Sequence, residues 1–569
     1  MFSFPRWTLV AVLLLISLQL VSGDETKTPA VPPELAAADQ LYRAGKFVDA
    51  EASYRTLLRT DSKLVPAQVG LVRTMLRQQR VDEAFEAVNA ALAAQSDSAA
   101  LLAAKGDVQF RRAEMANAEL SYLAAKKLDH NEVRAYLGLA TVYSAYSMYR
   151  MAYGELQIAH DLAPNNIDVR RAWLNTLPRK ERLAALEAYL AEPHPDDAEE
   201  TAGMTQYLEF LRATADKPAH TCRLISKVEQ TETKLEKFDT LDFEGGWHSR
   251  RYSISHGVGL AVGVNHQNVK LLLDTGAGGI MVSRKVADKA GLTRLSATRV
   301  GGIGDHGSQG GYLAVADHIQ IGELEFRDCI ITVPDQGFKI AGDGLIGADV
   351  FGSYLIDIDL PGMRLKLSPL PSRPEDTVAP TSLNSEGEDQ TNVEQREQKD
   401  GNSTTPAPMT SAPALKDTHR LPKDRYIAPE MVDWTKVFRF GHNILVPTNV
   451  NDSKAMLFGL DTGAFSNFLS LRAARQVGNV TSDYSMGVRG LSGTVKNVYT
   501  AKAVLRFGRL QLPNLDIVTF DLSSQSRRLG TELSGFLGFQ MLQLLELKLD
   551  YRDGLVDFVY DPKRASHVR

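Results

Sequence analysis

The chain has 569 residues, which is too long for one compact core and suggests three or four domains. Its hydrophobic fraction of 44%, charged fraction of 23% and net charge of −5 are ordinary for a globular protein, and they give no basic footprint for nucleic acid. Two cysteines are too few for a disulfide-stapled scaffold, an iron–sulfur protein or a cysteine-built zinc module. We therefore expect neither a metal site nor a cofactor, and no nucleic-acid partner.

Residues 1–23 have the pattern of a secretory signal peptide. Arg6 precedes a 13-residue apolar run from Thr8 to Leu20, and small residues follow before Asp24. The run is short for a membrane span, which needs about 20 residues. We expect an exported protein, periplasmic or secreted, with no membrane span in the mature chain; an uncleaved N-terminal anchor is the alternative. Outside the cytoplasm the two cysteines, Cys222 and Cys329, either pair or remain as buried free thiols.

Residues 31–215 begin with a pattern that recurs every 34 residues. One position of the pattern is always alanine: Ala50, Ala84, Ala118 and Ala152. Four residues after each alanine stands a larger apolar residue: Tyr54, Val88, Tyr122 and Leu156. Twelve residues before each alanine stands a mostly small residue: Ala38, Val72, Gly106 and Ala140. The pattern resembles the tetratricopeptide repeat, a helix–turn–helix unit that stacks into an α-solenoid. Residues 167–215 continue as helices that cap the array. The resemblance implies a docking surface for a protein partner; the alternative is an array that only orients the rest of the chain.

The remainder reads as two copies of one mainly-β domain, over residues 222–370 and 425–563. In each copy an apolar strand runs into Asp-Thr-Gly-Ala, and the two aspartates, Asp274 and Asp461, are 187 residues apart. A helical stretch, a glycine-rich loop and alternating strands follow in the same order, and both copies end on a strand. Between them, residues 371–424 contain no aromatic residue and few aliphatic ones, which predicts a disordered linker.

The repeated elements resemble the retropepsin-like aspartic proteases. That resemblance implies two β-lobes of the acid-protease fold, with Asp274 and Asp461 as the catalytic pair. The residues beside them would support the active site: Thr275, Gly276, Ala277, Thr462, Gly463 and Ala464. The glycine-rich loops would be flaps that bind substrate: Gly302, Ile303 and Gly304 in the first copy; Gly490, Leu491 and Ser492 in the second. The late apolar–apolar–Gly elements contribute Gly347 and Gly538.

Two neighbouring carboxyl groups suit peptide hydrolysis because one can act as base while the other, protonated, acts as acid. We therefore expect an exported aspartic-type endopeptidase that cleaves peptide or protein substrates, with its two aspartates at the interface of its own lobes. A 54-residue linker has a reach of roughly 40 Å, which is enough to let the lobes of one chain pair. Three alternatives remain: a catalytically silent peptide-binding protein, a scaffold that acts through its repeats, and lobes that pair only between two chains.

Several other residues have weaker signals. Residues 302–307 match the dinucleotide-binding pattern GxGxxG, but the sequence after them reads as a strand, which favours a flap. Four histidines of the first lobe lack the spacing of metal ligands: His256, His266, His306 and His318. Four acidic residues near Gly347 are interpreted as turn and strand-end positions: Asp343, Asp349, Asp357 and Asp359.

Overall fold

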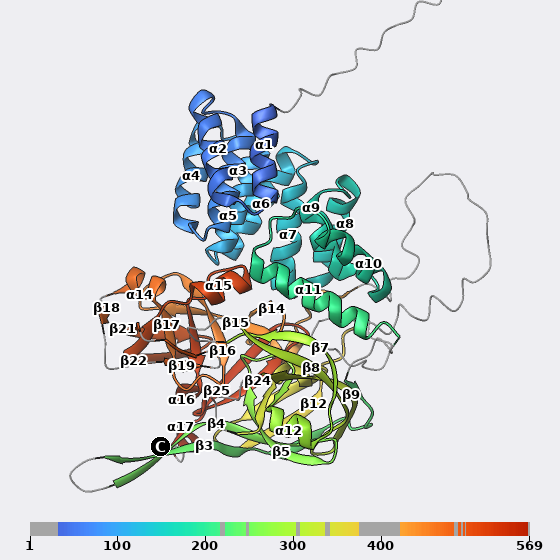
Figure 1. Ribbon diagram of the computed structural model, residues 1–569. Coiled ribbons are helices and arrows are strands. Elements are labelled where there is room, and N and C mark those ends of the chain that lie inside the picture. Colours follow the sequence, from blue (N-terminus) through green and yellow to red (C-terminus); the bar gives the residue numbers. More distant parts are fainter. Residues whose placement is uncertain are drawn as a thin grey trace, which may run out of the picture.

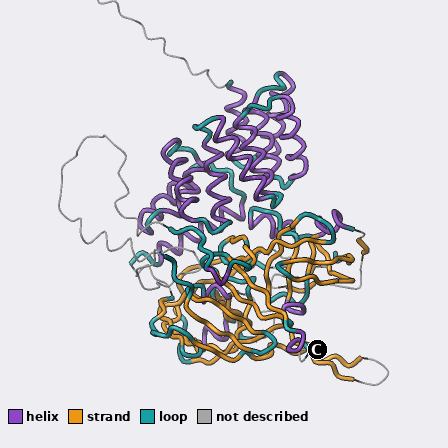
Figure 2. Tube along the Cα trace, turned by 180° about the vertical axis from the view of Figure 1, so that it is seen from behind, coloured by secondary structure: helices purple, strands orange, loops and turns teal. Residues whose placement is uncertain are grey.

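The structure, a computed structural model, has an all-α region followed by two β lobes (Figure 1). It describes residues 32–216, 222–245, 250–302, 308–335, 342–374, 422–478, 480–482, 488–490, 493–495 and 497–566. The expected signal peptide and most of the expected linker therefore lie outside the described residues. Seen from behind, helices gather at one end of the molecule and strands at the other (Figure 2).

The repeats form eight antiparallel helices, paired as the 34-residue period predicts. Their bounds are α1 Pro33–Arg43, α2 Phe47–Thr60, α3 Val65–Arg77, α4 Val81–Ala94, α5 Ala99–Arg111, α6 Met115–Leu128, α7 Val133–Ala145 and α8 Tyr149–Leu162. The recurring alanines are buried between helices, and at Gly106 an added Cβ would lie 2.5 Å from the Tyr122 ring. Small residues are thus needed where neighbouring helices approach each other. Three more helices follow: α9 Ile167–Trp173, α10 Arg179–Leu190 and α11 Ala198–Ala213.

The first lobe is built on a nine-stranded sheet with the path β1-β9-β6-β10-β5-β4-β8-β7, and β3 pairs with β4. Its strands are β1 Arg223–Leu224, β3 Glu236–Gly245, β4 Arg250–Val264, β5 Gln267–Asp274, β6 Ile280–Val282, β7 Thr293–Val300, β8 Gln309–Ile321, β9 Leu324–Pro334 and β10 Gly344–Gly347. Two short helices accompany them, α12 Arg284–Lys289 and η2 Ala348–Phe351. Ser283 caps α12 by accepting a hydrogen bond from the Val286 amide at 3.3 Å.

The second lobe repeats this arrangement. Its strands are β14 Phe438–Phe440, β15 Asn443–Val450, β16 Ala455–Asp461, β17 Phe468–Ser470, β18 Val480–Ser482, β19 Val488–Gly490, β20 Gly493–Val495, β21 Tyr499–Phe507, β22 Leu510–Phe520 and β23 Gly535–Gly538, with helices η5 Pro429–Met431, α14 Leu471–Val477, α15 Ser523–Leu529, α16 Phe539–Leu542 and α17 Pro562–Ala565. In the first lobe β8 pairs with β9 as well as with β4, so the path β15-β16-β23-β17-β22-β21-β18 of the second lobe has the same strand neighbours as β4-β5-β10-β6-β9-β8-β7 of the first. In both lobes an extra pairing, β4 with β8 or β15 with β21, closes the sheet on itself.

A six-stranded sheet joins the two lobes, in the order β13-β25-β24-β11-β12-β2. Its strands are β2 Thr231–Lys234, β11 Tyr354–Asp359, β12 Arg364–Pro369, β13 Thr435–Lys436, β24 Leu545–Asp550 and β25 Leu555–Tyr560. At its centre β11 of the first lobe pairs antiparallel with β24 of the second, from Ile356 opposite Leu549 to Asp359 opposite Glu546. The two lobes of this one chain therefore share backbone hydrogen bonds and a continuous apolar core.

The helical region is packed against the second lobe. Phe110 of α5 lies 6.2 Å from Phe440 between ring centroids, and the Thr531 hydroxyl donates to the Phe110 carbonyl at 2.7 Å. One apolar cluster includes residues of α5–α8 together with Leu445, Phe520 and other side chains of the second lobe. The first lobe meets the helical region mainly where α11 lies next to β7 (Figure 1).

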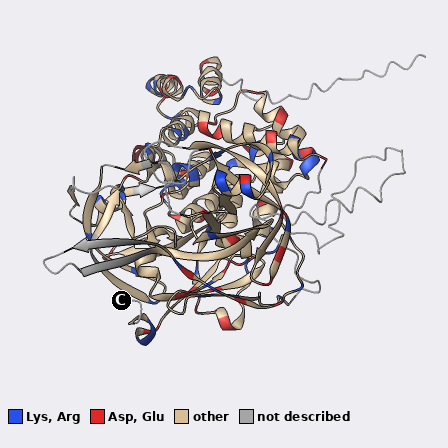
Figure 3. Cartoon of the chain, turned by 60° about the horizontal axis from the view of Figure 1, so that its bottom comes forward, with Lys and Arg blue, Asp and Glu red and all other residues tan. Residues whose placement is uncertain are grey.

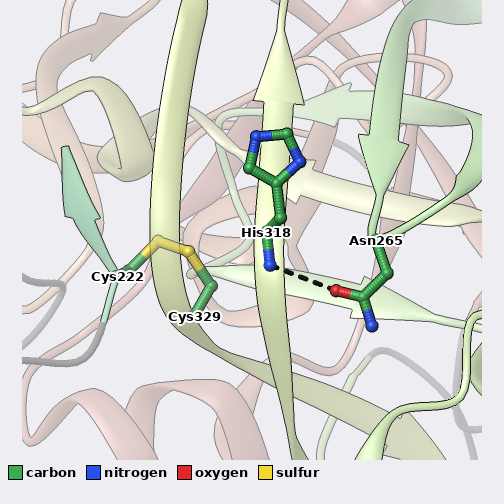
Figure 4. Close-up of a disulfide and its surroundings, with 4 residues drawn as sticks. All are labelled: Cys222, Asn265, His318 and Cys329. Carbon is green, nitrogen blue, oxygen red and sulfur yellow. Dashed lines mark hydrogen bonds between the residues drawn. A yellow bond between two sulfur atoms is a disulfide. The ribbon is translucent and has the colours of Figure 1, made fainter. Parts of the chain in front are cut away.

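A disulfide joins Cys222 to Cys329 (Figure 4). It connects the residue just before β1 with β9, across a sequence separation of 107 residues. Of the two alternatives left by the sequence, the structure has the paired one. Charged residues of both signs are spread over the helical and β regions (Figure 3). Within the described ranges, no helix is both long enough and apolar enough to cross a membrane.

Candidate active site

The two Asp-Thr-Gly-Ala segments lie at equivalent places, each at the end of a central strand. Asp274 ends β5, which runs parallel to β10 with Gly347 opposite the aspartate. Asp461 ends β16 in the same way, parallel to β23 with Gly538 opposite. An added Cβ at Gly347 would strike the Ala277 carbonyl, and one at Gly538 would strike the Ser466 carbonyl. The late glycines thus leave room for the turn that carries each aspartate.

The threonines bind the two turns to each other across the lobe interface. The amide of Thr275 donates to the Thr462 hydroxyl at 3.0 Å, and the amide of Thr462 donates to the Thr275 hydroxyl at 3.0 Å. Each hydroxyl then donates to the carbonyl before the opposite aspartate, Thr275 to Leu460 and Thr462 to Leu273, both at 2.8 Å. Both threonines are fully buried. Four mutual hydrogen bonds in a dry environment fix the relative position of the turns.

The glycines bring each turn against the opposite carboxyl group. An added Cβ at Gly276 would lie 2.7 Å from the Asp461 Cγ, and one at Gly463 would clash with the Asp274 carboxyl. The two carboxyl groups are hydrogen-bonded to each other. Asp274 also accepts from the Gly276 amide at 2.8 Å, while Asp461 accepts from Gly463 at 2.9 Å and Ala464 at 2.7 Å.

These surroundings change the acidity of both groups. Burial raises the pKa of Asp274, although the amide of Gly276, its bond to Asp461 and the charge of His442 lower it. Burial, together with the charge of Asp274, raises the pKa of Asp461 well above its ordinary value. Because two adjacent carboxylates repel each other, such a pair holds one proton between them and titrates as a unit. That is the state in which one carboxyl group can serve as acid and the other as base.

The expected flaps are described only in part. Gly302 follows β7, and its carbonyl accepts a hydrogen bond from Arg528 of α15 at 3.3 Å. After the gap, β8 returns antiparallel to β7, so the GxGxxG segment lies between two strands and does not open a helix. In the second lobe Gly490 ends β19 and pairs with Gly493 of β20. Ile303, Gly304, Leu491 and Ser492 lie outside the described residues.

Asp349 has a larger role than the turn position that the sequence suggested. Its buried carboxyl group accepts the Gly279 amide at 3.0 and 3.2 Å, next to the first Asp-Thr-Gly-Ala turn. Burial raises the pKa of Asp349 to about 6. In the second lobe a side chain links the same two segments in the opposite sense: the side-chain oxygen of Asn467, six residues after Asp461, accepts the amide of the late glycine Gly538 at 2.8 Å. An acid two residues after the late glycine was the available signal, and it was obscured because the second copy has Gln540 there.

His442 is a second residue near the site that the sequence did not single out. It lies in the turn between β14 and β15, and its ring covers Gly278, where an added Cβ would lie 2.7 Å from Nδ1. The charge of Asp274 acts on this imidazole. No local motif marks His442, but its position before Asp461 resembles that of His256 before Asp274. A comparison of the two copies could have found it.

The helical region contains its own group of charged residues, and they are paired within the chain. Arg73 of α3 contacts Asp168 of α9 at 2.5 Å, and Arg77 contacts Glu200 of α11 at 2.5 Å. Arg134 contacts Asp107 at 2.8 Å. The capping helices therefore supply the acids for arginines near the start of the array. Among the residues that the structure describes, no cluster of three or more histidine, cysteine or acidic side chains could hold a metal ion.

Comparison with family models divides the chain as the geometry does. Residues 260–353 match the aspartyl protease family of gag polyproteins, and residues 446–541 match an aspartyl protease family. Residues 41–108 match a tetratricopeptide repeat. No curated protein sequence matches the chain. The chain thus carries two β lobes of the aspartyl protease type behind tetratricopeptide repeats.

Solved structures similar to parts of the chain include an aspartic proteinase from Irpex lacteus, at 14% identity and a TM-score of 0.29 over 55% of this chain and 96% of that one. A thermophilic tetratricopeptide repeat protein of Thermus thermophilus has 19% identity and a TM-score of 0.25, over 30% of this chain and 97% of that one. A tetratricopeptide repeat protein of Parabacteroides merdae has 16% identity and a TM-score of 0.23, over 33% and 77% respectively.

Proposed function

We propose that the protein is an exported aspartic-type endopeptidase whose catalytic pair, Asp274 and Asp461, comes from the two lobes of one chain. The observation that carries the proposal is the set of four hydrogen bonds that Thr275 and Thr462 make across the lobe interface, two to each other and two to the carbonyls of Leu460 and Leu273. They hold the two aspartate-bearing turns together, and the carboxyl groups are in mutual contact. Neither copy has lost its aspartate or its threonine, which favours an enzyme over a catalytically silent peptide-binding protein.

In this mechanism the pair begins with one proton. The ionised carboxylate takes a proton from a water molecule as that water attacks the scissile carbonyl carbon, and the protonated partner gives its proton to the carbonyl oxygen. The tetrahedral intermediate then breaks its C–N bond while the leaving nitrogen takes a proton from the carboxyl group that received it. Gly276, Gly463 and Ala464 hold the carboxyl oxygens by their amides, so that little reorganisation is needed.

Export is supported by the signal-like residues 1–23 and by the disulfide between Cys222 and Cys329. Disulfides persist in oxidising compartments and are rare in the cytosol. We place the mature protein in a periplasm or a secreted space. Fractionation of cells that make the full chain tests this, with N-terminal sequencing to locate the cleavage. Recovery of uncleaved protein from the cytosol would contradict it.

The tetratricopeptide repeats give the protein a capacity for protein interaction, and we propose that they dock a substrate or partner. A second role is favoured by the apolar cluster that α5–α8 share with the second lobe, because this packing fixes the lobe on the array. The arginines of α3 are already paired with Asp168 and Glu200. We propose that a partner binds at α6, where the apolar side chains of Leu120 and Leu128 are exposed.

Peptide cleavage between pH 3 and 8 tests the enzymatic proposal, with wild type compared with Asp274→Asn and Asp461→Asn. Each substitution removes a group that must ionise or donate, so we expect kcat/KM to fall by roughly 100- to 10,000-fold. Asp288→Asn changes an exposed acid of α12 and serves as the matched control. Full activity in either active-site variant would exclude the pair within one chain. Tight binding of peptides without any cleavage would favour the silent alternative.

A further inference from the structure

Two histidines cross the lobe interface at related positions. His256 of β4, in the first lobe, packs against Phe465 of the second lobe, with ring centroids 5.1 Å apart and planes tilted by 47°. His442, in the second lobe, packs against Gly278 of the first, where an added Cβ would lie 2.7 Å from Nδ1 and 2.8 Å from Cγ. Each histidine thus lies on the segment that follows the opposite Asp-Thr-Gly-Ala.

The residues that receive the two histidines occupy the same place in the two copies. Gly278 and Phe465 each come directly after the alanine of Asp-Thr-Gly-Ala. The copies therefore differ by one side chain at this position: the second lobe has an aromatic ring there, and the first lobe has none. The ring of Phe465 is the contact surface for His256, whereas the absent side chain of Gly278 leaves its volume to the imidazole of His442.

This difference makes the surroundings of the two aspartates unequal. The charge of His442 acts on Asp274 and lowers the pKa of that carboxyl group. The strongest influences on Asp461 are burial, the charge of Asp274 and the amides of Ala464 and Gly463. The lobes share a fold and a turn sequence, yet Asp274 has a neighbouring imidazole that can carry a positive charge.

We propose that His442 is a positioning residue for the catalytic pair: its protonated ring holds the negative charge on Asp274, so that the shared proton stays on Asp461. This deepens the proposed protease function and rests on it. Asp274 is then the base that activates water, and Asp461 is the acid that donates to the carbonyl oxygen. The assignment follows from the Gly278–Phe465 difference, since the two turns themselves are nearly symmetric.

The sign of the pH dependence follows from the groups that face His442. These are Asp274 and Arg439, and Arg439 in turn lies over the Tyr551 ring, 5.4 Å from its centroid. Burial and the charge of Arg439 lower the pKa of His442, while Asp274 raises it. The ring is therefore charged only on the acidic side of its ordinary range. There it stabilises ionised Asp274 and extends activity to lower pH.

The test compares pH profiles of kcat/KM for wild type, His442→Gln and His256→Gln. We expect His442→Gln to move the acidic limb of the kcat/KM profile to higher pH by roughly half a pH unit. At a given pH on that limb this is about a threefold loss of kcat/KM, with little change at the optimum. His256→Gln is the matched control and leaves the acidic limb in place. His442→Lys restores a cation and moves the limb back. Superimposed profiles for wild type and His442→Gln, or an equal shift for His256→Gln, would overturn the proposal.

A second variant and a second readout keep the result independent of folding and of catalysis. Gly278→Phe gives the first lobe the residue of the second, displaces the His442 ring and should shift the limb as His442→Gln does. Infrared titration of protein with 13C-labelled aspartate carboxyl groups follows the protonation of Asp274 without substrate, and we expect Asp274 to stay protonated up to a higher pH in the His442→Gln variant than in wild type. If no variant cleaves any peptide, the proposed function fails, and an unchanged infrared titration separately rejects the role of His442.

Discussion

The two β lobes have the same strand order but are stabilised by different means. The first lobe is cross-linked by the disulfide between Cys222 and Cys329 and touches the helices mainly through α11 and β7. The second lobe has no cysteine and shares an apolar cluster with α5–α8. A duplicated fold thus keeps its pairing pattern while covalent and noncovalent support are distributed unequally.

The lobes differ at the active site in the same manner. Asp349, two residues after the late glycine, supports the first turn with a buried carboxyl group, whereas Asn467, six residues after Asp461, supports the late glycine of the second lobe with a neutral amide. Gly278 admits a histidine to the first turn, whereas Phe465 fills the same place in the second. The parts that join the lobes, Thr275 and Thr462, are matched; the parts that set charge are not. Symmetric joining with asymmetric charge suits a site in which two identical acids need different roles.

Removal of the disulfide should have the largest effect on the difference in stability between the two lobes. With Cys222→Ala and Cys329→Ala together, the loss of a cross-link over 107 residues should cost about 4 kcal/mol of the free energy of unfolding of the first lobe. Hydrogen exchange resolved by lobe checks it, because protection should fall in β5 and β9 and persist in β16 and β22. Wild type under reducing conditions is the control. Equal loss in both lobes would show that they unfold as one unit.

Shortening a side chain at the interface between the helices and the second lobe should destabilise the second lobe. Phe110→Ala removes a buried ring between α5 and Phe440, at a cost of about 3 kcal/mol. We expect hydrogen exchange to accelerate in β14 and β15 before it changes in the first lobe. Val88→Ala is the control, since Val88 is buried in a cluster made only of repeat residues. If both substitutions affect the second lobe alike, the shared cluster is not its support.

The carboxyl group of Asp349 should make the stability of the first lobe depend on pH. Its pKa of about 6 lies above the ordinary value of 3.8, so the native state favours the protonated form. The contribution of Asp349 to the free energy of unfolding is fully present below about pH 4 and is lost as the pH rises through 6. Asp349→Asn should match wild type at pH 4 and exceed it at pH 7 by on the order of 2 kcal/mol in chemical unfolding.

The mirror substitution sharpens the same point. Asn467→Asp places a carboxyl group at the buried side chain that links the second turn to its late glycine. We expect it to introduce a fall in stability between pH 4 and 7 that wild type lacks in that lobe, because the buried charge is not solvated. A flat difference between this variant and wild type would mean that the two supports are not equivalent.

Much of the architecture could be read from repeated patterns. The 34-residue spacing of Ala50, Ala84, Ala118 and Ala152 predicted the helix pairs, because small residues must recur where helices approach. Two copies of Asp-Thr-Gly-Ala with matched downstream elements predicted two lobes of one fold, and the helices after Ser283 and Ser470 begin as expected. The catalytic roles of Asp274 and Asp461 remain predictions, since their activity requires measurement.

Other features could not be predicted from the sequence because they depend on residues that are distant along the chain. His442 and Gly278 belong to different lobes, and no local spacing relates them. The pairing of Arg73 with Asp168 and the packing of Phe110 on Phe440 likewise join separate parts of the chain. Asp349 appeared to be a turn residue because its partner, the Gly279 amide, carries no side-chain signal.

The sequence by itself determined the repeat array, the duplicated β fold and the residue types of the candidate site, because periodicity and motif are local properties of the chain. The tertiary structure decided which residues of the two lobes meet, whether the cysteines pair, and which aspartate has a histidine beside it. Those outcomes depend on the geometry of an interface. There, one missing side chain at Gly278 decides what can approach a carboxyl group.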